Sequence, residues 1–151
     1  MRRMYLVLIA LGIVAFLAVS AILARVYSAD NAERTALTGL VQAEARGNTA
    51  AVIARIENCR QSPACTARAA EVSAALRHSG AVQVLQIQAS TGFNVVSTTG
   101  TARVAWDVGG SLPIVQCVVV HRAGNAVSGL HVELIKVSPR IKSDADCPSS
   151  F

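Results

Sequence analysis

An unbroken apolar stretch near the N-terminus constrains this chain more than any other feature. The 21 residues from Met4 to Ala24 carry no charge, and most of them are Leu, Ile, Val, Ala or Phe. A helix rises about 1.5 Å per residue, so a helix of this length spans roughly 30 Å, the thickness of the hydrocarbon core of a bilayer. The stretch therefore predicts a transmembrane helix over residues 4–25.

The charges beside this stretch predict its orientation. Arg2 and Arg3 precede it, and short flanking segments rich in Lys or Arg resist translocation. Arg25 opposes this orientation weakly, but the acidic residues Asp30 and Glu33 follow it. We expect residues 1–3 to stay in the cytoplasm and the rest of the chain to lie outside it, as in a single-pass protein of the cell membrane.

A cleaved signal peptide is the alternative to a retained anchor. Small residues at Ser20–Ala21 and at Ala24 offer possible cleavage sites. However, the apolar stretch is longer than the core of about 7 to 15 residues in such peptides, and no helix-breaking residue precedes those sites. This favours retention, and both alternatives place the remaining chain in the same compartment.

Length and charge limit the part of the chain beyond the anchor. The 151 residues leave room for one ordinary domain, expected over residues 26–142 with a loose tail at 143–151. The net charge of +5 overstates the charge of the domain, because three of the arginines lie in the first 25 residues. The remaining residues carry 11 basic against 9 acidic side chains. A domain so nearly balanced lacks the basic stripe that nucleic acids require, so no nucleic-acid partner is expected.

Four cysteines occur, all beyond the anchor, and an even number suits an oxidising compartment. Three connectivities are possible, and we expect Cys59 to pair with Cys65 and Cys117 with Cys147. The first pair brackets a short turn, and the second would fasten the C-terminal tail to a strand. Zinc is the competing explanation, but the spacings do not form two CxxC motifs, so no metal is predicted.

Three helices are expected after the anchor. Asp30 and Glu33 have the spacing of an N-cap and an acidic partner, and Gly47 would end this first helix. Thr49 is expected to cap the second helix, which runs to about Cys59. Ser62 is expected to cap the third helix, with Pro63 at its first position and Gly80 at its end.

Beyond Gly80 the pattern changes to alternating and β-branched residues, typical of strands. Turns are expected at Gly109–Gly110 and at Gly124–Asn125. Helices first and hairpins second predict an α+β domain, with about three helices on one face of a four-stranded antiparallel sheet. The strands are expected at 82–88, 101–108, 114–122 and 130–137, with a further ragged strand at 93–96.

Two stretches resemble a known family. The segment ALTGLVQAEARGNTAAVIARI, with its turn at Arg46–Ala51, and the later GTARVAWDVGG are similar to the bacterial branch of nuclear-transport-factor-like domains. The resemblance covers about residues 30–138 and implies a cystatin-like cone fold. Single-span proteins with such a domain resemble components of secretion, conjugation and lipid-import machinery. Three helices before an unbroken sheet depart from the family's usual layout.

Catalytic chemistry has one candidate group. His121 and His131 lie on adjacent expected strands, and Glu133 shares a face with His131. An imidazole beside a carboxylate can perform general acid or base catalysis. However, the alternation of the last strand turns His131 and Glu133 toward water, so we predict no catalytic residue, no enzymatic activity and no cofactor.

Two functions remain. The first is non-enzymatic: a bitopic membrane protein whose outer domain mediates protein–protein assembly in a cell-envelope or secretion-type complex, with a partner protein or with copies of itself. Valines on both faces of residues 115–120 favour such association. The alternative is the capture of a small apolar or lipid-like ligand between helices and sheet, in a possible pocket formed by Trp106, Phe93, Val104 and His121.

Overall fold

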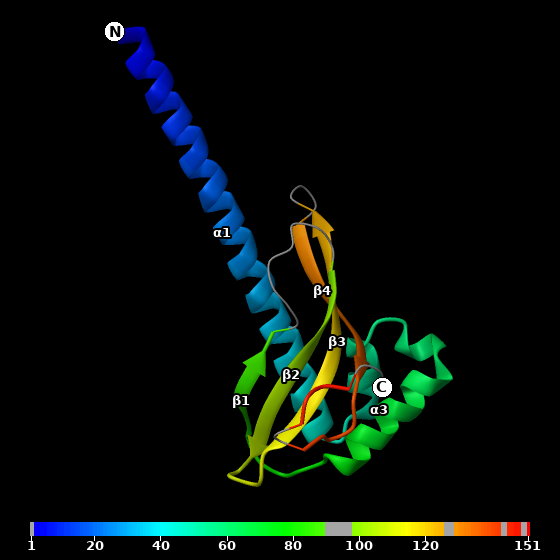
Figure 1. The fold of residues 1–151 in the computed structure, drawn as a ribbon. Coiled ribbons are helices and arrows are strands. Elements are labelled where there is room, and N and C mark those ends of the chain that lie inside the picture. Colours follow the sequence, from blue (N-terminus) through cyan, green and yellow to red (C-terminus); the bar gives the residue numbers. More distant parts are fainter. Residues whose placement is uncertain (1, 90–97, 126–128, 143–144, 149–150) are drawn as a thin grey trace.

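The computed structural model describes residues 2–89, 98–125, 129–142, 145–148 and 151. Figure 1 shows an α+β fold, as predicted, in which a long helix runs behind an antiparallel sheet and shorter helices lie beside it. The elements are α1 (Arg2–Ala45), α2 (Thr49–Arg55), a 3-10 turn η1 (Cys59–Gln61), α3 (Pro63–Ala75), β1 (Val82–Gln88), β2 (Thr98–Val108), β3 (Ile114–Asn125) and β4 (Gly129–Val137).

The anchor and the first domain helix form one continuous helix, α1, of 44 residues. The predicted N-cap at Asp30 is wrong. No Gly or Pro interrupts residues 25–36, and Asp30 instead pairs within the helix with Arg34, at 2.8 Å between Oδ2 and Nε. The apolar stretch is therefore coupled to the domain without a linker.

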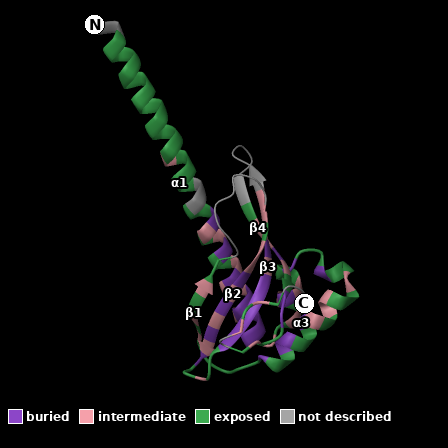
Figure 2. Cartoon of the chain, in the orientation of Figure 1, coloured by how far each residue is buried: buried purple, intermediate pink, exposed green. Residues whose placement is uncertain are grey.

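The two halves of α1 have different surroundings (Figure 2). The N-terminal half is exposed, and it contains an 18-residue window of mean hydropathy 3.0 with no buried residue. It is long and apolar enough to cross a membrane. Burial begins at Ala29, and the C-terminal half packs on the sheet through Leu37, Leu40 and Val41. One helix thus serves both as the apolar stalk and as the centre of the domain core.

The sheet has the order β1-β2-β3-β4, and all its neighbouring strands are antiparallel. The predicted strand at 82–88 is confirmed, and the other three are found with longer ends. The predicted turn at Gly124–Asn125 is wrong, because both residues continue β3 and pair with Leu130 and Gly129. The ragged strand expected at 93–96 lies outside the described residues.

Alternate residues of β2 face α1 and form the core. Ala102, Val104, Trp106 and Val108 share one face of β2, and all four are buried. Residues from α1, α2, α3, β3 and β4 complete the same cluster. The gap between helix and sheet is therefore filled by side chains.

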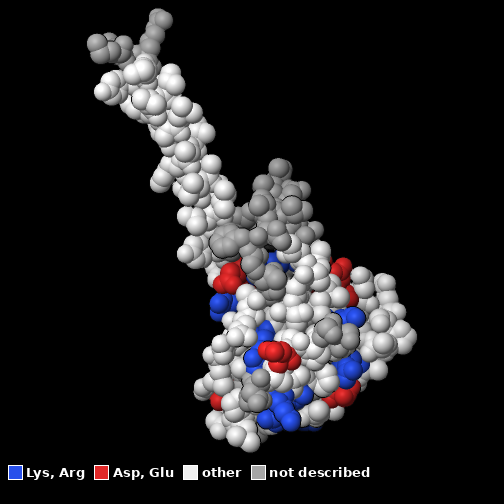
Figure 3. All heavy atoms as spheres, viewed as in Figure 1, with Lys and Arg blue, Asp and Glu red and all other residues white. Residues whose placement is uncertain are grey.

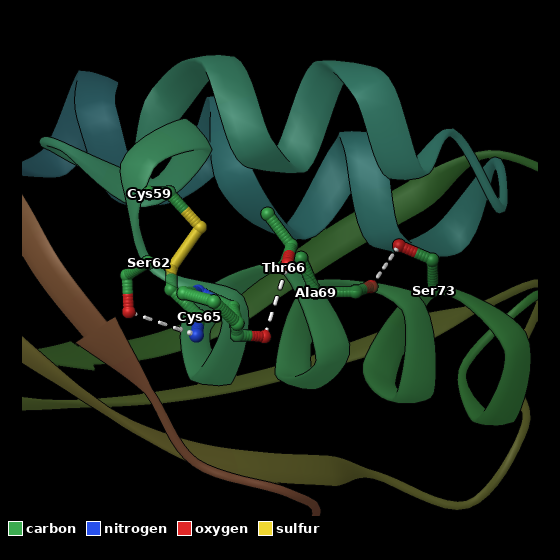
Figure 4. Close-up of a disulfide and its surroundings, with 7 residues drawn as sticks. Cys59, Ser62, Cys65, Thr66, Ala69 and Ser73 are labelled. Atoms are coloured by element: carbon green, nitrogen blue, oxygen red, sulfur yellow. Dashed lines mark hydrogen bonds between the residues drawn. A yellow bond between two sulfur atoms is a disulfide. The ribbon is translucent and has the colours of Figure 1, made fainter.

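The predicted boundaries of the shorter helices are confirmed in part. Ser62 caps α3, as predicted, with its Oγ accepting from the Cys65 N–H at 3.3 Å (Figure 4). Asn48 caps α2 in place of the predicted Thr49, because its Oδ1 accepts from the Ala51 N–H at 3.0 Å. α2 also ends earlier than expected, since Ile56 leaves the helix to pair with Leu134 of β4.

Both predicted disulfides are present. Cys59–Cys65 links η1 to the first turn of α3 (Figure 4), and Cys117–Cys147 joins the middle of β3 to the tail. The chain after β4 is ordered before it reaches Cys147, because the Ile141 N–H donates to the Val115 carbonyl oxygen at 2.8 Å. The disulfide thus fixes a segment that returns along β3.

The two disulfides are expected to differ in their effect on stability. Removing Cys117–Cys147 by a paired change to serine should lower the free energy of unfolding by about 3.7 kcal/mol, because this bond closes the longer loop. Removing Cys59–Cys65 in the same way should cost about 2 kcal/mol. Urea unfolding of the full chain in detergent, followed by Trp106 fluorescence, measures both. Equal losses for the two variants would contradict the loop-entropy account.

Candidate functional site

Three of the four residues predicted to line a pocket are described by the structure, and they do not line any of the hollows described below. Trp106 and Val104 are fully buried in the core. The Trp106 Nε1–H donates to Gln116 Oε1 at 2.9 Å, and the Gln116 Nε2–H donates to the Ser138 carbonyl oxygen at 3.2 Å. His121 is part-exposed and neighbours none of them in register, whereas Phe93 lies outside the described residues. The indole thus belongs to a hydrogen-bonded core.

An acidic residue, Glu44, is fully buried near this network. Among the described residues, neither of its carboxyl oxygens has a hydrogen-bond partner. Burial raises the pKa of Glu44 to about 8, although the nearby Gln116 side chain opposes part of the rise. The carboxyl is therefore neutral at pH 7, which is how the core tolerates it. Sequence patterns missed Glu44, since its position near the end of α1 does not reveal burial.

A second buried acid, Glu33, joins α1 to the sheet. Its Oε2 accepts from the Arg122 Nε–H at 2.7 Å, and the Arg122 Nη2 lies 2.5 Å from the same oxygen. The Glu33 side chain is fully buried and that of Arg122 is 16% exposed. The predicted role of Glu33 in a helix cap is wrong, because the residue lies in mid-helix and its partner is 89 positions away. This pair holds α1 on β3.

The histidines and Glu133 lie on the opposite face of the sheet from Trp106. His121 and Glu133 are cross-strand partners, and His131 Nε2 lies 3.1 Å from Glu133 Oε1. The His121 Nδ1 is also 3.0 Å from Thr99 Oγ1. The side chain of His131 is 62% exposed, in agreement with the predicted wet face. A hydrogen bond with Glu133 raises the pKa of Glu57, a neighbour that sequence reasoning missed.

The imidazoles and carboxyls of this group can donate and accept hydrogen bonds. Within the described ranges, no three or more His, Cys, Asp or Glu residues are arranged to hold a metal ion. The group lies on the surface, away from the packed interior that a desolvated catalytic site would need. Its chemistry is that of a polar surface patch.

Several hollows mark the surface of the domain. One of about 500 Å³ lies between α1, α2 and β4, and another of about 280 Å³ lies beside β1. Two more, of about 360 and 390 Å³, border η1 and the segment after β4. Neither Trp106, Val104 nor His121 lines these four hollows.

Charge is dispersed over the face shown in Figure 3, where small groups of both signs alternate with uncharged surface. The described side chains of the projecting part of α1, from Met4 to Ala24, are uncharged. Exposed large apolar residues also occur on the domain, with Leu85 in β1 at 51% exposure and Leu112 in the β2–β3 turn at 80%. Uncharged surface near a sheet edge is suited to contact with another polypeptide.

Comparison with family models, curated proteins and solved structures finds no match to this chain.

Proposed function

We propose that this chain is a single-pass membrane protein, anchored by residues 4–25, whose C-terminal domain lies outside the cytoplasm. Arg2 and Arg3 at the start of α1 favour a cytoplasmic N-terminus. Two disulfides suit an oxidising compartment. The apolar stretch continues into the core-forming half of α1 without interruption, so a retained anchor would hold the domain directly at the membrane.

Topology can be tested with a C-terminal alkaline phosphatase fusion, an enzyme that needs an oxidising compartment. The fusion is expected to be active and to sediment with membranes, and the unfused chain should keep the mass of 15.7 kDa that its full sequence gives. An inactive fusion would overturn the orientation. A shorter mature chain that is released from membranes would overturn the anchor.

The function supported best is protein–protein assembly in a cell-envelope or secretion-type complex, without enzymatic activity. The observation that carries this proposal is the filled interior: Trp106, Val104 and Leu37 occupy the gap between sheet and helix. The outer surface is then the part of the domain available for binding. A helix without an interruption holds that surface at a fixed position near the membrane, which suits a component of a complex.

The alternative, capture of an apolar or lipid-like ligand, has no specific observation in its favour. Its expected pocket residues Trp106 and Val104 are core residues, and the hollows that are described lie elsewhere. The resemblance to nuclear-transport-factor-like domains agrees with a role in envelope machinery, and it stays part of the proposal.

Assembly can be tested on the tagged full chain, solubilised from its native membranes in a mild detergent. Native electrophoresis and size-exclusion chromatography with light scattering are expected to give a protein mass well above 15.7 kDa. Mass spectrometry of that species then identifies its components. A protein mass of one chain, in membranes where the chain is expressed at its natural level, would overturn the proposal.

A further inference from the structure

The two edges of the sheet differ in how they are covered. At β4, the segment after α2 closes the edge, because the Glu57 N–H donates to the Leu134 carbonyl oxygen at 2.7 Å and Ile56 pairs with Leu134. At β1, no further strand of the described chain pairs on the outer side. The outward N–H and C=O groups of β1 are thus left without a strand partner there (Figure 1).

The composition of β1 does not protect this edge. Exposed edges in natural proteins are usually guarded by charged side chains or proline, which discourage pairing with another chain. The sequence of β1, VQVLQIQ, contains neither. A β-bulge between Val84 and Gln86 is the one protective feature of this kind, and Leu85 at the bulge is 51% exposed. The edge is therefore uncharged and carries an exposed leucine.

The side chains of β1 are also incompletely covered. Val82, Val84 and Ile87 pack on the core but stay only partly buried. The hollow of about 280 Å³ is lined by Leu85, Gln86 and Gln88 of β1 together with residues of β2 and of the start of β3, namely Arg103, Ala105, Pro113 and Val115. It therefore extends across the face of the sheet and does not follow the outer edge of β1. One more strand beside β1 would cover Val82, Val84 and Ile87 further.

We propose that the outer edge of β1 pairs with an extended segment of a partner polypeptide, whose alternate residues are apolar. This inference rests on the proposed function and names its partner class. The groups at this edge that lack a strand partner are main-chain N–H and C=O groups, so the partner segment must supply main-chain donors and acceptors in an extended conformation. The apolar side chains of that segment would continue the row formed by Val84 and Ile87.

A second copy of this chain does not fit the edge in one membrane. Two copies that pair through the same edge are related by a two-fold axis, and their β1 strands run antiparallel. α1 runs behind the sheet and projects beyond one end of it (Figure 1). Rotation about an axis normal to the sheet would direct the second α1 toward the opposite side. The extended segment therefore belongs to a different polypeptide.

Site-specific photocrosslinking of the full chain in its native membranes tests this inference. A benzoylphenylalanine replaces Gln83, Leu85 or Gln88 in turn, with Thr66 on α3 as the control position. Adducts to one protein are expected from the three edge positions. The crosslinked position in that protein should shift by the same number of residues as the crosslinker position in β1, because paired strands have a fixed register. Adducts without such a register, adducts to a second copy, or no adducts would each overturn the inference.

A charged variant provides a matched control. Leu85→Lys should lower adduct yield at Gln83 and Gln88 about tenfold, because lysine guards edges. Leu112→Lys, which changes an even more exposed leucine, should leave the yield unchanged. Both variants are expected to keep their disulfides and melting temperature, which checks folding. Undiminished crosslinking by Leu85→Lys would overturn the inference. If the chain forms its complex but crosslinks only through other surfaces, assembly stands and the β1 inference fails.

Discussion

Replacing Arg122 by methionine is expected to lower the free energy of unfolding by about 3–5 kcal/mol. The change removes the guanidinium that donates to Glu33 Oε2 at 2.7 Å, and with it a charge partner of a fully buried carboxyl. Methionine keeps the aliphatic part of the side chain, so little packing is lost. Urea unfolding of the full chain in detergent measures the effect through the fluorescence of Trp106, the single tryptophan, which is fully buried.

The double variant Glu33→Leu/Arg122→Met is the control for this prediction. Removing both charges should restore most of the stability, because replacement of a buried ion pair by apolar residues is often neutral or stabilising. If the double variant is as unstable as Arg122→Met, the loss comes from packing and the ion pair is not its cause. The melting temperature should follow the same order.

The stability of the domain should fall as pH rises from about 4.5 to about 8, because of Glu44. Burial raises the pKa of this carboxyl from 4.5 in the unfolded chain to about 8 in the folded one. Between these values the unfolded chain has released the proton and the folded chain still holds it. The contribution of Glu44 is therefore most favourable below pH 4.5 and is lost progressively up to pH 8. The total loss is on the order of 5 kcal/mol.

Glu44→Gln isolates this effect, because a glutamine does not titrate. The free energy of unfolding of the variant and of the natural chain is measured with urea at pH 5, 7 and 9. The variant should gain stability relative to the natural chain from pH 5 to 7 and again from pH 7 to 9. Glu57, whose pKa is also raised, is present in both chains, so its contribution cancels. Parallel pH profiles would show that Glu44 gains a partner on ionisation and would contradict the prediction.

Elements defined by neighbouring residues could be predicted well. The Ser62–Pro63 start of α3 depends on a hydroxyl and an N–H three residues apart, and β1 was found at its predicted bounds because Val and Gln alternate along it. The cap at Asp30 failed for the opposite reason. A cap forms only where the helix begins, and here the anchor had already started the helix on the N-terminal side of Asp30.

In the candidate site, too, features that depend on neighbouring residues could be predicted, and contacts between distant residues could not. The wet face of β4 followed from alternation, which correctly turned His131 toward solvent. That Glu57 would lie beside Glu133 could not be foreseen, because the contact depends on α2 ending early and on the following residues pairing with β4. Trp106 was expected to line a possible pocket, whereas its burial in the core and its hydrogen bond to Gln116 depend on how β2 packs and on its register against β3.

The sequence by itself determined the apolar stretch of membrane length, the order of helices before strands, and the short turn that Cys59 and Cys65 bracket, because each depends on composition or on residues close along the chain. The pairing of Cys117 with Cys147, 30 positions apart, was one of the possible connectivities. Only the tertiary structure decided that anchor and domain share one helix, that Glu33 meets Arg122 and that Glu44 is buried. It also decided that β4 is covered, while no strand of the described residues pairs on the outer side of β1. These features depend on which distant segments lie together once the chain is packed, and local patterns carry no such information.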